Sequence, residues 1–202
     1  MIKTLIFDFG DVFLTLDKSA IQQHLGKYNI PALDKSLIEV NTDYEQGLIS
    51  TSEFISHYTH RFPQLTSQEF KTAWNSILIE FPQYRLDFLK NLASSNRFHL
   101  ILLSNTNTLH IDWVKAHIPV FDEFKACFHQ FYLSHEIHFR KPKPDIFEFV
   151  LNKNQLKPEE TLFIDDTLEH TLTAKNLGIH TWHLQVGEED VTDLFTAKSS
   201  LF

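Results

Sequence analysis

Short apolar runs recur along the chain, and several of them end abruptly at polar residues. The clearest are residues 5–7 before Asp8, residues 98–103 before Ser104 and Asn105, and residues 161–164 before Asp165 and Asp166. Runs of this length predict buried parallel strands. Two more strands are predicted over residues 128–133 and 180–184. Because ligands bind at the carboxyl edge of such sheets, these polar residues are expected to meet at one site.

Between residues 15 and 84 the apolar residues change to helical spacing, as at Phe54 and Tyr58. Two helix starts are indicated at residues 50–53 and 66–69, where a hydroxyl residue is followed three positions later by Glu. Breaks between helices are predicted at residues 29–31, 47, 61–63 and 81–82.

From residue 85 the alternation of strands and helices resumes, with helices predicted over residues 86–92, 145–151, 168–177 and 191–196. The chain therefore predicts an α/β fold. Its Rossmann-like parallel sheet core is formed by residues 1–14 and 85–202. Residues 15–84 form an α-helical cap, inserted directly after the first strand and placed to cover Asp8.

Composition narrows the function. A hydrophobic fraction of 43% with 19 Phe excludes a disordered chain, and a formal net charge of −8 argues against a nucleic-acid surface. The single Cys127 lies in an apolar stretch that favours a packed thiol over a nucleophile. No apolar run reaches about 18 residues and no leader pattern opens the chain, so we expect a cytoplasmic protein without a membrane span.

The polar residues after the strands have structural and chemical interpretations. Asp8 could be a turn residue, and Ser104 with Asn105 could cap a helix or hold an anion. The adjacent carboxylates of Asp165 and Asp166 repel each other unless a cation or hydrogen bonds compensate, which indicates a divalent metal. Lysines 141 and 143 stand in HEIHFRKPKPD, where two prolines stiffen the chain.

Four segments in order, FDFGDV, LLSNTN, RKPKPDIF and FIDDTLEHTLTAKNLG, resemble the motifs of the haloacid dehalogenase-like (HAD) hydrolase superfamily. The resemblance spans residues 2–182, with the insertion where that family has its type 1 cap. Within the family it is similar to the branch of small bacterial phosphatases that includes glucose-1-phosphate phosphatase. The resemblance implies a Mg²⁺-dependent phosphatase acting on a small phosphorylated metabolite, such as a sugar phosphate, through an aspartyl phosphate.

The resemblance also implies a role for each matching residue. Asp8 would be the nucleophile, Lys141 would neutralise charge on it, and Ser104 and Asn105 would bind substrate. The protein ligands of Mg²⁺ would be Asp8, the Gly10 carbonyl, Asp165 and Asp166. Oxygen ligands of this kind suit Mg²⁺, which would also screen Asp8 from an anionic substrate.

The sequence departs from the family pattern at Gly10, where most phosphatases of the superfamily carry the Asp that protonates the leaving alcohol. Three outcomes are open. Asp11 could substitute, although its side chain should point elsewhere. A water or a cap residue could carry the proton. The enzyme could also be slow and favour good leaving groups, such as the anomeric oxygen of a sugar 1-phosphate.

Other functions remain open at this level. A low-turnover or inactive binding or regulatory module would keep the fold and the metal site. A haloacid dehalogenase would use Asp8 on carbon and would need no metal, which leaves the acidic pair unexplained. A phospho-receiver domain has its acidic pair on the first strand, the reverse of the order here.

Restoring the missing acid tests this interpretation. General acid–base catalysis contributes about 10² to 10⁴ in rate. We therefore expect Gly10→Asp to raise kcat for phosphate esters with poor leaving groups more than for activated aryl esters. An equal or absent effect on the two classes would contradict the assignment of the missing acid to this position.

Overall fold

The computed structural model describes residues 1–30 and 32–202, so Pro31, in the predicted break at 29–31, lies outside the described residues. Five parallel strands form the central sheet in the order β5-β4-β1-β6-β7. Their bounds are β1 Thr4–Phe7, β4 His99–Ser104, β5 Gln130–Leu133, β6 Thr161–Asp165 and β7 His180–His183. The predicted parallel sheet is confirmed, with each strand within two residues of its expected ends.

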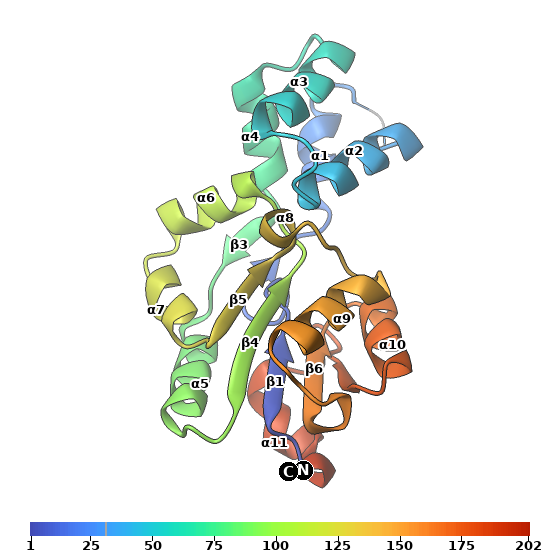
Figure 1. The fold of residues 1–202 in the computed structure, drawn as a ribbon. Helices are drawn as coiled ribbons and strands as arrows, with labels where there is room; N and C mark the ends of the chain where they lie inside the picture. The colour runs from blue at the N-terminus through green and yellow to red at the C-terminus, as the bar shows by residue number, and fades with distance from the viewer. Residues whose placement is uncertain (31) are drawn as a thin grey trace.

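Helices cover both faces of the sheet (Figure 1). They are α5 Gln83–Ser94, α6 Thr108–His117, α7 Phe121–Ala126, α8 Ser134–Ile137, α9 Pro144–Lys153, α10 Leu168–Asn176 and α11 Leu194–Ala197, with 3₁₀ turns η1 Pro158–Glu160, η2 Val191–Asp193 and η3 Ser199–Leu201. The single helix expected at 191–196 is thus divided into η2 and α11. The two chain ends meet at the base of the sheet, where Ile2 N donates to Leu201 O at 3.4 Å.

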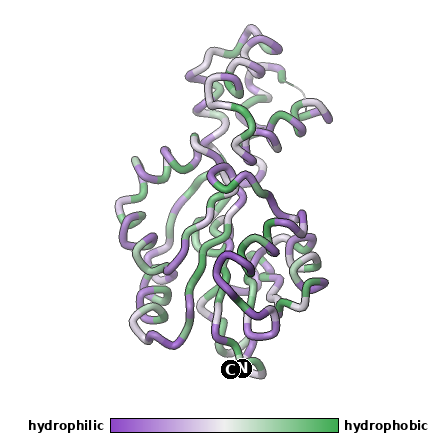
Figure 2. The backbone as a smooth tube through the Cα atoms, in the orientation of Figure 1, coloured by the Kyte–Doolittle hydropathy of each residue, from purple (hydrophilic) through white to green (hydrophobic). Residues whose placement is uncertain are grey.

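Alternate residues of the strands serve different faces. Leu5 and Phe7 belong to the cluster formed with α5, α6 and α7, whereas Ile6 belongs to the cluster formed with α9 and α10. This follows from the two-residue period of a strand. Because both faces are covered, the strands are apolar throughout, as the central green segments of Figure 2 show.

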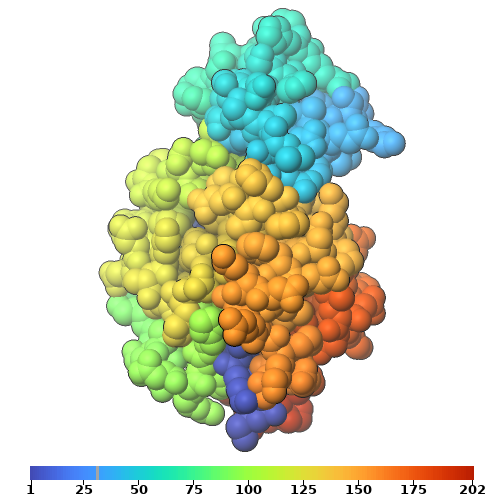
Figure 3. Space-filling model, viewed as in Figure 1, coloured from blue at the N-terminus to red at the C-terminus, as the bar shows by residue number. Residues whose placement is uncertain are grey.

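The helices α1 Ala20–Gly26, α2 Lys35–Glu45, α3 Thr51–Arg61 and α4 Ser67–Asn75 form a smaller lobe above the carboxyl edge of the sheet (Figures 1 and 3). They enclose an aromatic cluster in which Phe54 stacks on Tyr44 at 4.0 Å between ring centroids and meets Phe70 and Trp74 edge to face. Aromatic pairs of this kind contribute about 0.5 to 1.5 kcal/mol each beyond the area they bury.

Local sequence signals explain where two of these helices begin. Ser50 with Glu53 and Thr66 with Glu69 form complete capping boxes at the starts of α3 and α4. In each, the hydroxyl accepts from a free backbone N–H while the Glu carboxylate accepts from the cap residue. Both predicted helix starts are confirmed.

The inserted segment is not wholly helical, contrary to the sequence expectation. β2 Thr15–Leu16 and β3 Leu78–Glu80 pair antiparallel where the chain leaves and re-enters the sheet region. Leu78 follows Trp74 at helical spacing, but α4 ends at Asn75. Leu78 therefore pairs with β2 as part of a strand, although its spacing from Trp74 is that of a helix.

Cys127 is partly buried after α7, against the main core cluster, and its thiol donates to the Glu123 carbonyl at 3.3 Å. Burial raises the pKa of this thiol. A raised thiol pKa is the opposite of what a nucleophilic cysteine needs. Within the residues that the structure describes, no helix is both long and apolar enough to cross a membrane.

A hydrogen-bonded junction ties α4 to α6. Asn107 Oδ1 accepts from the His110 N–H and from Trp74 Nε1, so its Nδ2 donates to His110 Nδ1. The other ring nitrogen of His110 then donates to the Trp74 carbonyl at 3.1 Å. The network assigns a neutral ring, and burial lowers the pKa of His110 to about 4. Neighbouring Leu109 packs into the cluster of the upper lobe.

This junction predicts acid sensitivity. An ordinary His has a pKa near 6.5. Between about pH 6.5 and 4, His110 is therefore protonated in the unfolded chain but remains neutral in the folded protein. Stability is therefore lost as pH falls through this window, by about 2 to 3 kcal/mol. His110→Gln should lose correspondingly less free energy of unfolding between pH 7.5 and 4.5 in denaturant titrations. Exposed His57→Gln is the control, and equal losses in His110→Gln and wild type would contradict the assignment.

Candidate active site

Residues from three neighbouring strands meet at the carboxyl edge of the sheet. Asp8 follows β1 at its centre, and Ser104 and Asp165 end the flanking strands β4 and β6. All three are buried. The parallel registers place Asp8 level with Asp165, and Ser104 lies one residue further along its strand. The sequence expectation of a single polar cluster at this edge agrees with the geometry.

Lys141 reaches the same point from the connection between α8 and α9. Its ammonium donates to Asp8 Oδ1 at 2.8 Å, to Asp165 Oδ2 at 2.7 Å and to the Leu103 carbonyl at 2.8 Å. The side chain is fully buried, and all three of its donors are used. Lys143, the other candidate lysine, is largely exposed and is the residue before α9.

Asn105 holds the backbone of Lys141 rather than pointing into open space. Its Nδ2 donates to the Lys141 carbonyl at 2.9 Å, and its Oδ1 accepts from the Lys141 N–H at 3.0 Å. This two-point clamp fixes the segment that carries the ammonium. Asn105, which the sequence interpretation gave a role in substrate binding, lines the pocket, but the described contacts of its side-chain amide are with the backbone of Lys141.

Charges and burial oppose each other at this cluster. Burial raises the pKa of Asp8 to about 6, although the Lys141 ammonium counteracts it. Burial acts in the same direction on Asp165, but Lys141 and His170 outweigh it and lower that pKa to about 2. For Lys141 burial acts to lower the pKa, yet Asp165 and Asp8 together raise it. At neutral pH the lysine and both carboxylates are therefore charged.

The carboxylates fit a divalent cation. Asp8, Asp165 and Asp166 each offer an oxygen within 4.8 Å of the other two. Four carboxylates, these three and Asp11, face the ammonium groups of Lys18 and Lys141 through direct ion pairs. The carboxylates outnumber these ammonium groups four to two, an excess that Mg²⁺ would offset, and their hard oxygen donors suit that ion.

Gly10 leaves room that another side chain fills. A Cβ atom at residue 10 would lie 2.7 Å from Leu16 Cδ1. The carboxylate of Asp11 does not face the pocket: it accepts from the Leu16 N–H at 3.0 Å and pairs with Lys18 at 2.9 Å. These contacts direct the Asp11 side chain away from the pocket, which disfavours it as a substitute for the missing acid. A Gly10→Asp variant is best combined with Leu16→Ala, which removes the obstructing side chain.

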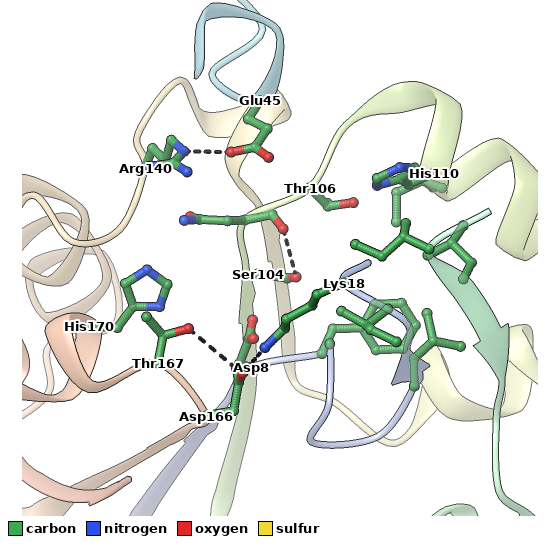
Figure 4. Close-up of a pocket in the computed structure, with 18 of the residues that line it drawn as sticks. Asp8, Lys18, Glu45, Ser104, Thr106, His110, Arg140, Asp166, Thr167 and His170 are labelled. Atoms are coloured by element: carbon green, nitrogen blue, oxygen red, sulfur yellow. Dashed lines mark hydrogen bonds and ion pairs between the residues drawn. The ribbon is translucent and has the colours of Figure 1, made fainter. Parts of the chain in front are cut away.

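A pocket of about 430 Å³ opens above Asp8 between the sheet edge and the upper lobe (Figure 4). Its polar lining also includes Glu45, Thr106 and Thr167. Five further polar residues of the lining were missed by the sequence interpretation: Lys18, His110, Arg140, Glu169 and His170. One wall is apolar and includes Leu16, Ile77 and Ile111. The volume suits a small metabolite.

Of the missed residues, His170 could most readily have been predicted from the sequence. Its Nδ1 lies 3.0 Å from both oxygens of Asp165, and it stands on α10 one turn after the acidic pair. A histidine at that distance from a strand-ending carboxylate points back toward it, which is a usable sequence signal. Lys18 and Arg140 gave no such signal because their reach depends on how the lobes pack.

Comparison with known proteins places these features in a family. A haloacid dehalogenase-like hydrolase model matches residues 2–178. D-ribitol-5-phosphate phosphatase from Bacteroides thetaiotaomicron is 31% identical over 201 residues, covering 94% of this chain and 95% of that protein. The chain is thus similar to that phosphatase along nearly its whole length.

Solved structures agree. A HAD family enzyme from B. thetaiotaomicron has a TM-score of 0.86 at 32% identity, covering 96% of this chain and 98% of that one. An Asp-to-Ala variant of it, in complex with magnesium and inorganic phosphate, has a TM-score of 0.84 at 31% identity, covering 96% and 99%. A predicted HAD-like hydrolase from Porphyromonas gingivalis has a TM-score of 0.82 at 30% identity, covering 98% of both chains. The sheet, its strand-end cluster and these matches confirm the family expected from the four motifs: the chain belongs to the haloacid dehalogenase-like hydrolases and is a hydrolase.

Proposed function

We propose that this hydrolase is a Mg²⁺-dependent phosphatase that releases phosphate from a small sugar or sugar-alcohol phosphate through an aspartyl phosphate on Asp8. The observation that carries the proposal is the Lys141 ammonium fixed between Asp8 and Asp165 beside a third carboxylate. The magnesium complexes and the substrate name of the relatives described above support the same reaction class. We also propose that residues 15–84 act as the cap of the enzyme, with residues 1–14 and 85–202 as its core.

The first step would be attack of an Asp8 carboxylate oxygen on phosphorus, with cleavage of the bond from phosphorus to the ester oxygen. Lys141 engages Oδ1, so the other oxygen is the one available among the described contacts. The fixed ammonium opposes the charge that builds up between carboxylate and phosphoryl group. Ser104, at the end of β4, would donate its hydroxyl to a phosphoryl oxygen.

The second step would be attack of water on the phosphorus of aspartyl phosphate, which releases inorganic phosphate and regenerates the Asp8 carboxylate. When bound by Asp8, Asp165, Asp166 and the Gly10 carbonyl, Mg²⁺ supplies charge neutralisation for a dianionic ester. The leaving alkoxide would take its proton from water in the pocket, because Gly10 has no side chain and Asp11 is held by Leu16 and Lys18. The hydroxide that this leaves would be the nucleophile of the second step, so that the two steps together consume one water.

Each of the two alternative functions, an inactive binding module and a dehalogenase, leaves a feature of the site unexplained. An inactive binding module would have no need for a lysine with every donor engaged on the nucleophile and its neighbours. A dehalogenase would leave the three gathered carboxylates without a partner cation. We propose further that the partner is a small phosphorylated metabolite rather than a nucleic acid, given the formal charge of −8, and that the enzyme acts in the cytoplasm.

Phosphate release tests the proposal. Sugar phosphates, sugar-alcohol phosphates and p-nitrophenyl phosphate should be hydrolysed with Mg²⁺ and not after chelation. Asp8→Asn should lower kcat at least about 10³-fold, because it removes the nucleophile. Ser104→Ala, which keeps the nucleophile, should retain measurable turnover with a raised KM.

Each other outcome points to a different function. Absence of release from every ester, with Mg²⁺ bound in calorimetry, would favour the binding module. Halide release from a haloacid without metal would favour the dehalogenase. Full activity of Asp8→Asn would overturn the covalent mechanism.

A further inference from the structure

Glu45 and Arg140 form an ion pair between the cap and the core, on the pocket wall. Arg140 Nε donates to Glu45 Oε2 at 2.6 Å, and both side chains line the pocket. The side chain of Arg140 is 30% exposed and that of Glu45 is 22% exposed, so the pair is partly accessible to solvent. In Figure 4 the pair lies above Ser104, with Asp8 and Asp166 below it.

Backbone contacts next to Glu45, and a contact of the Arg140 guanidinium, hold the two partners in place. On the cap side the Gln46 carbonyl accepts from His138 Nδ1 at 2.9 Å. Gly47 adopts φ +66°, and a Cβ there would lie 2.2 Å from the His135 carbonyl oxygen, so only glycine allows this close seating on α8. On the core side, Arg140 NH1 donates to the Lys141 carbonyl at 3.1 Å.

Helix electrostatics do not explain Glu45. It is the last residue of α2, where the negative end of the helix dipole disfavours a carboxylate, and the last turn of α2 has no basic residue. A local rule broken in a pocket wall indicates a functional constraint. The compensating charge comes from Arg140 across the junction.

Two polar atoms of this ion pair remain available to hydrogen-bond a ligand. Glu45 Oε1 and Arg140 NH2 have no hydrogen-bond partner among the described residues, so the pair presents an acceptor beside a donor with no net charge. A hydroxyl group satisfies both, by donating to the carboxylate and accepting from the guanidinium. A carboxylate on the substrate would meet Glu45, and an ammonium would meet Arg140, each with like-charge repulsion.

We propose that Glu45 and Arg140 are specificity-determining residues that read the hydroxyl groups of the substrate's leaving group and reject ionised ones. The substrate is then a phosphate ester of a neutral polyhydroxyl compound. This inference rests on the proposed phosphatase function and adds the part of the substrate remote from phosphorus.

The test compares kcat/KM for three esters in the full-length enzyme with Mg²⁺: a pentitol 5-phosphate, 3-phosphoglycerate and p-nitrophenyl phosphate. Glu45→Gln leaves Arg140 unbalanced, so the ratio of 3-phosphoglycerate to pentitol phosphate should rise at least about 10-fold. Arg140→Met should lower pentitol phosphate hydrolysis about 10-fold or more relative to the aryl ester, which has no hydroxyl groups to read.

Glu39→Gln is the matched control, because it makes the same charge change on the same helix at an exposed position. It should leave all three ratios as in wild type. A pair that only latches the cap would lower kcat/KM for all three esters alike in Glu45→Gln and Arg140→Met, with unchanged ratios, and that result would overturn the inference. Absence of hydrolysis of all three esters by the wild type would instead refute the proposed function itself.

Discussion

The ammonium of Lys141 is the interaction on which the rest of the site depends. It is fully buried, and it donates to two carboxylates and one carbonyl at the carboxyl edge of the sheet. A buried ammonium without partners would lose its charge, and buried carboxylates without a cation would be protonated. Each group therefore keeps its charge only because the fold delivers the others to within about hydrogen-bond distance.

This mutual dependence explains the arrangement of the chain around it. Asp8 and Asp165 are placed by the register of adjacent strands, which leaves little freedom. Lys141 has no strand to hold it, and the amide of Asn105 supplies that restraint by bonding both backbone groups of the lysine. The carboxylates exceed the ammonium groups in the cluster, an excess that a divalent cation would offset.

The sequence predicted the parts of the site that local rules position. Asp8, Ser104, Asp165 and Asp166 follow apolar strands, and strand ends of a parallel sheet must meet. The amide contacts of Asn105 and the filling of the space beside Gly10 by Leu16 depend on side-chain packing across distant segments, which no local pattern encodes. The β2–β3 pairing was missed for a different reason, since strands of two and three residues are too short to show a periodic pattern.

In the proposed function, substrate recognition and catalysis share one short segment of chain. His138, Arg140 and Lys141 contact, in turn, the end of α2, the side chain of Glu45, and the carboxylate of Asp8. Any shift of the α1–α4 lobe relative to the sheet would therefore act on the peptide next to Lys141. Because interactions that fix the remote part of a substrate can orient its reacting group, a leaving group held at Glu45 and Arg140 would bring phosphorus into line with Asp8. Such positioning would matter more in the proposed mechanism, in which glycine stands in place of the proton donor, because orientation and charge stabilisation are then the means left for assisting the departure of the alcohol.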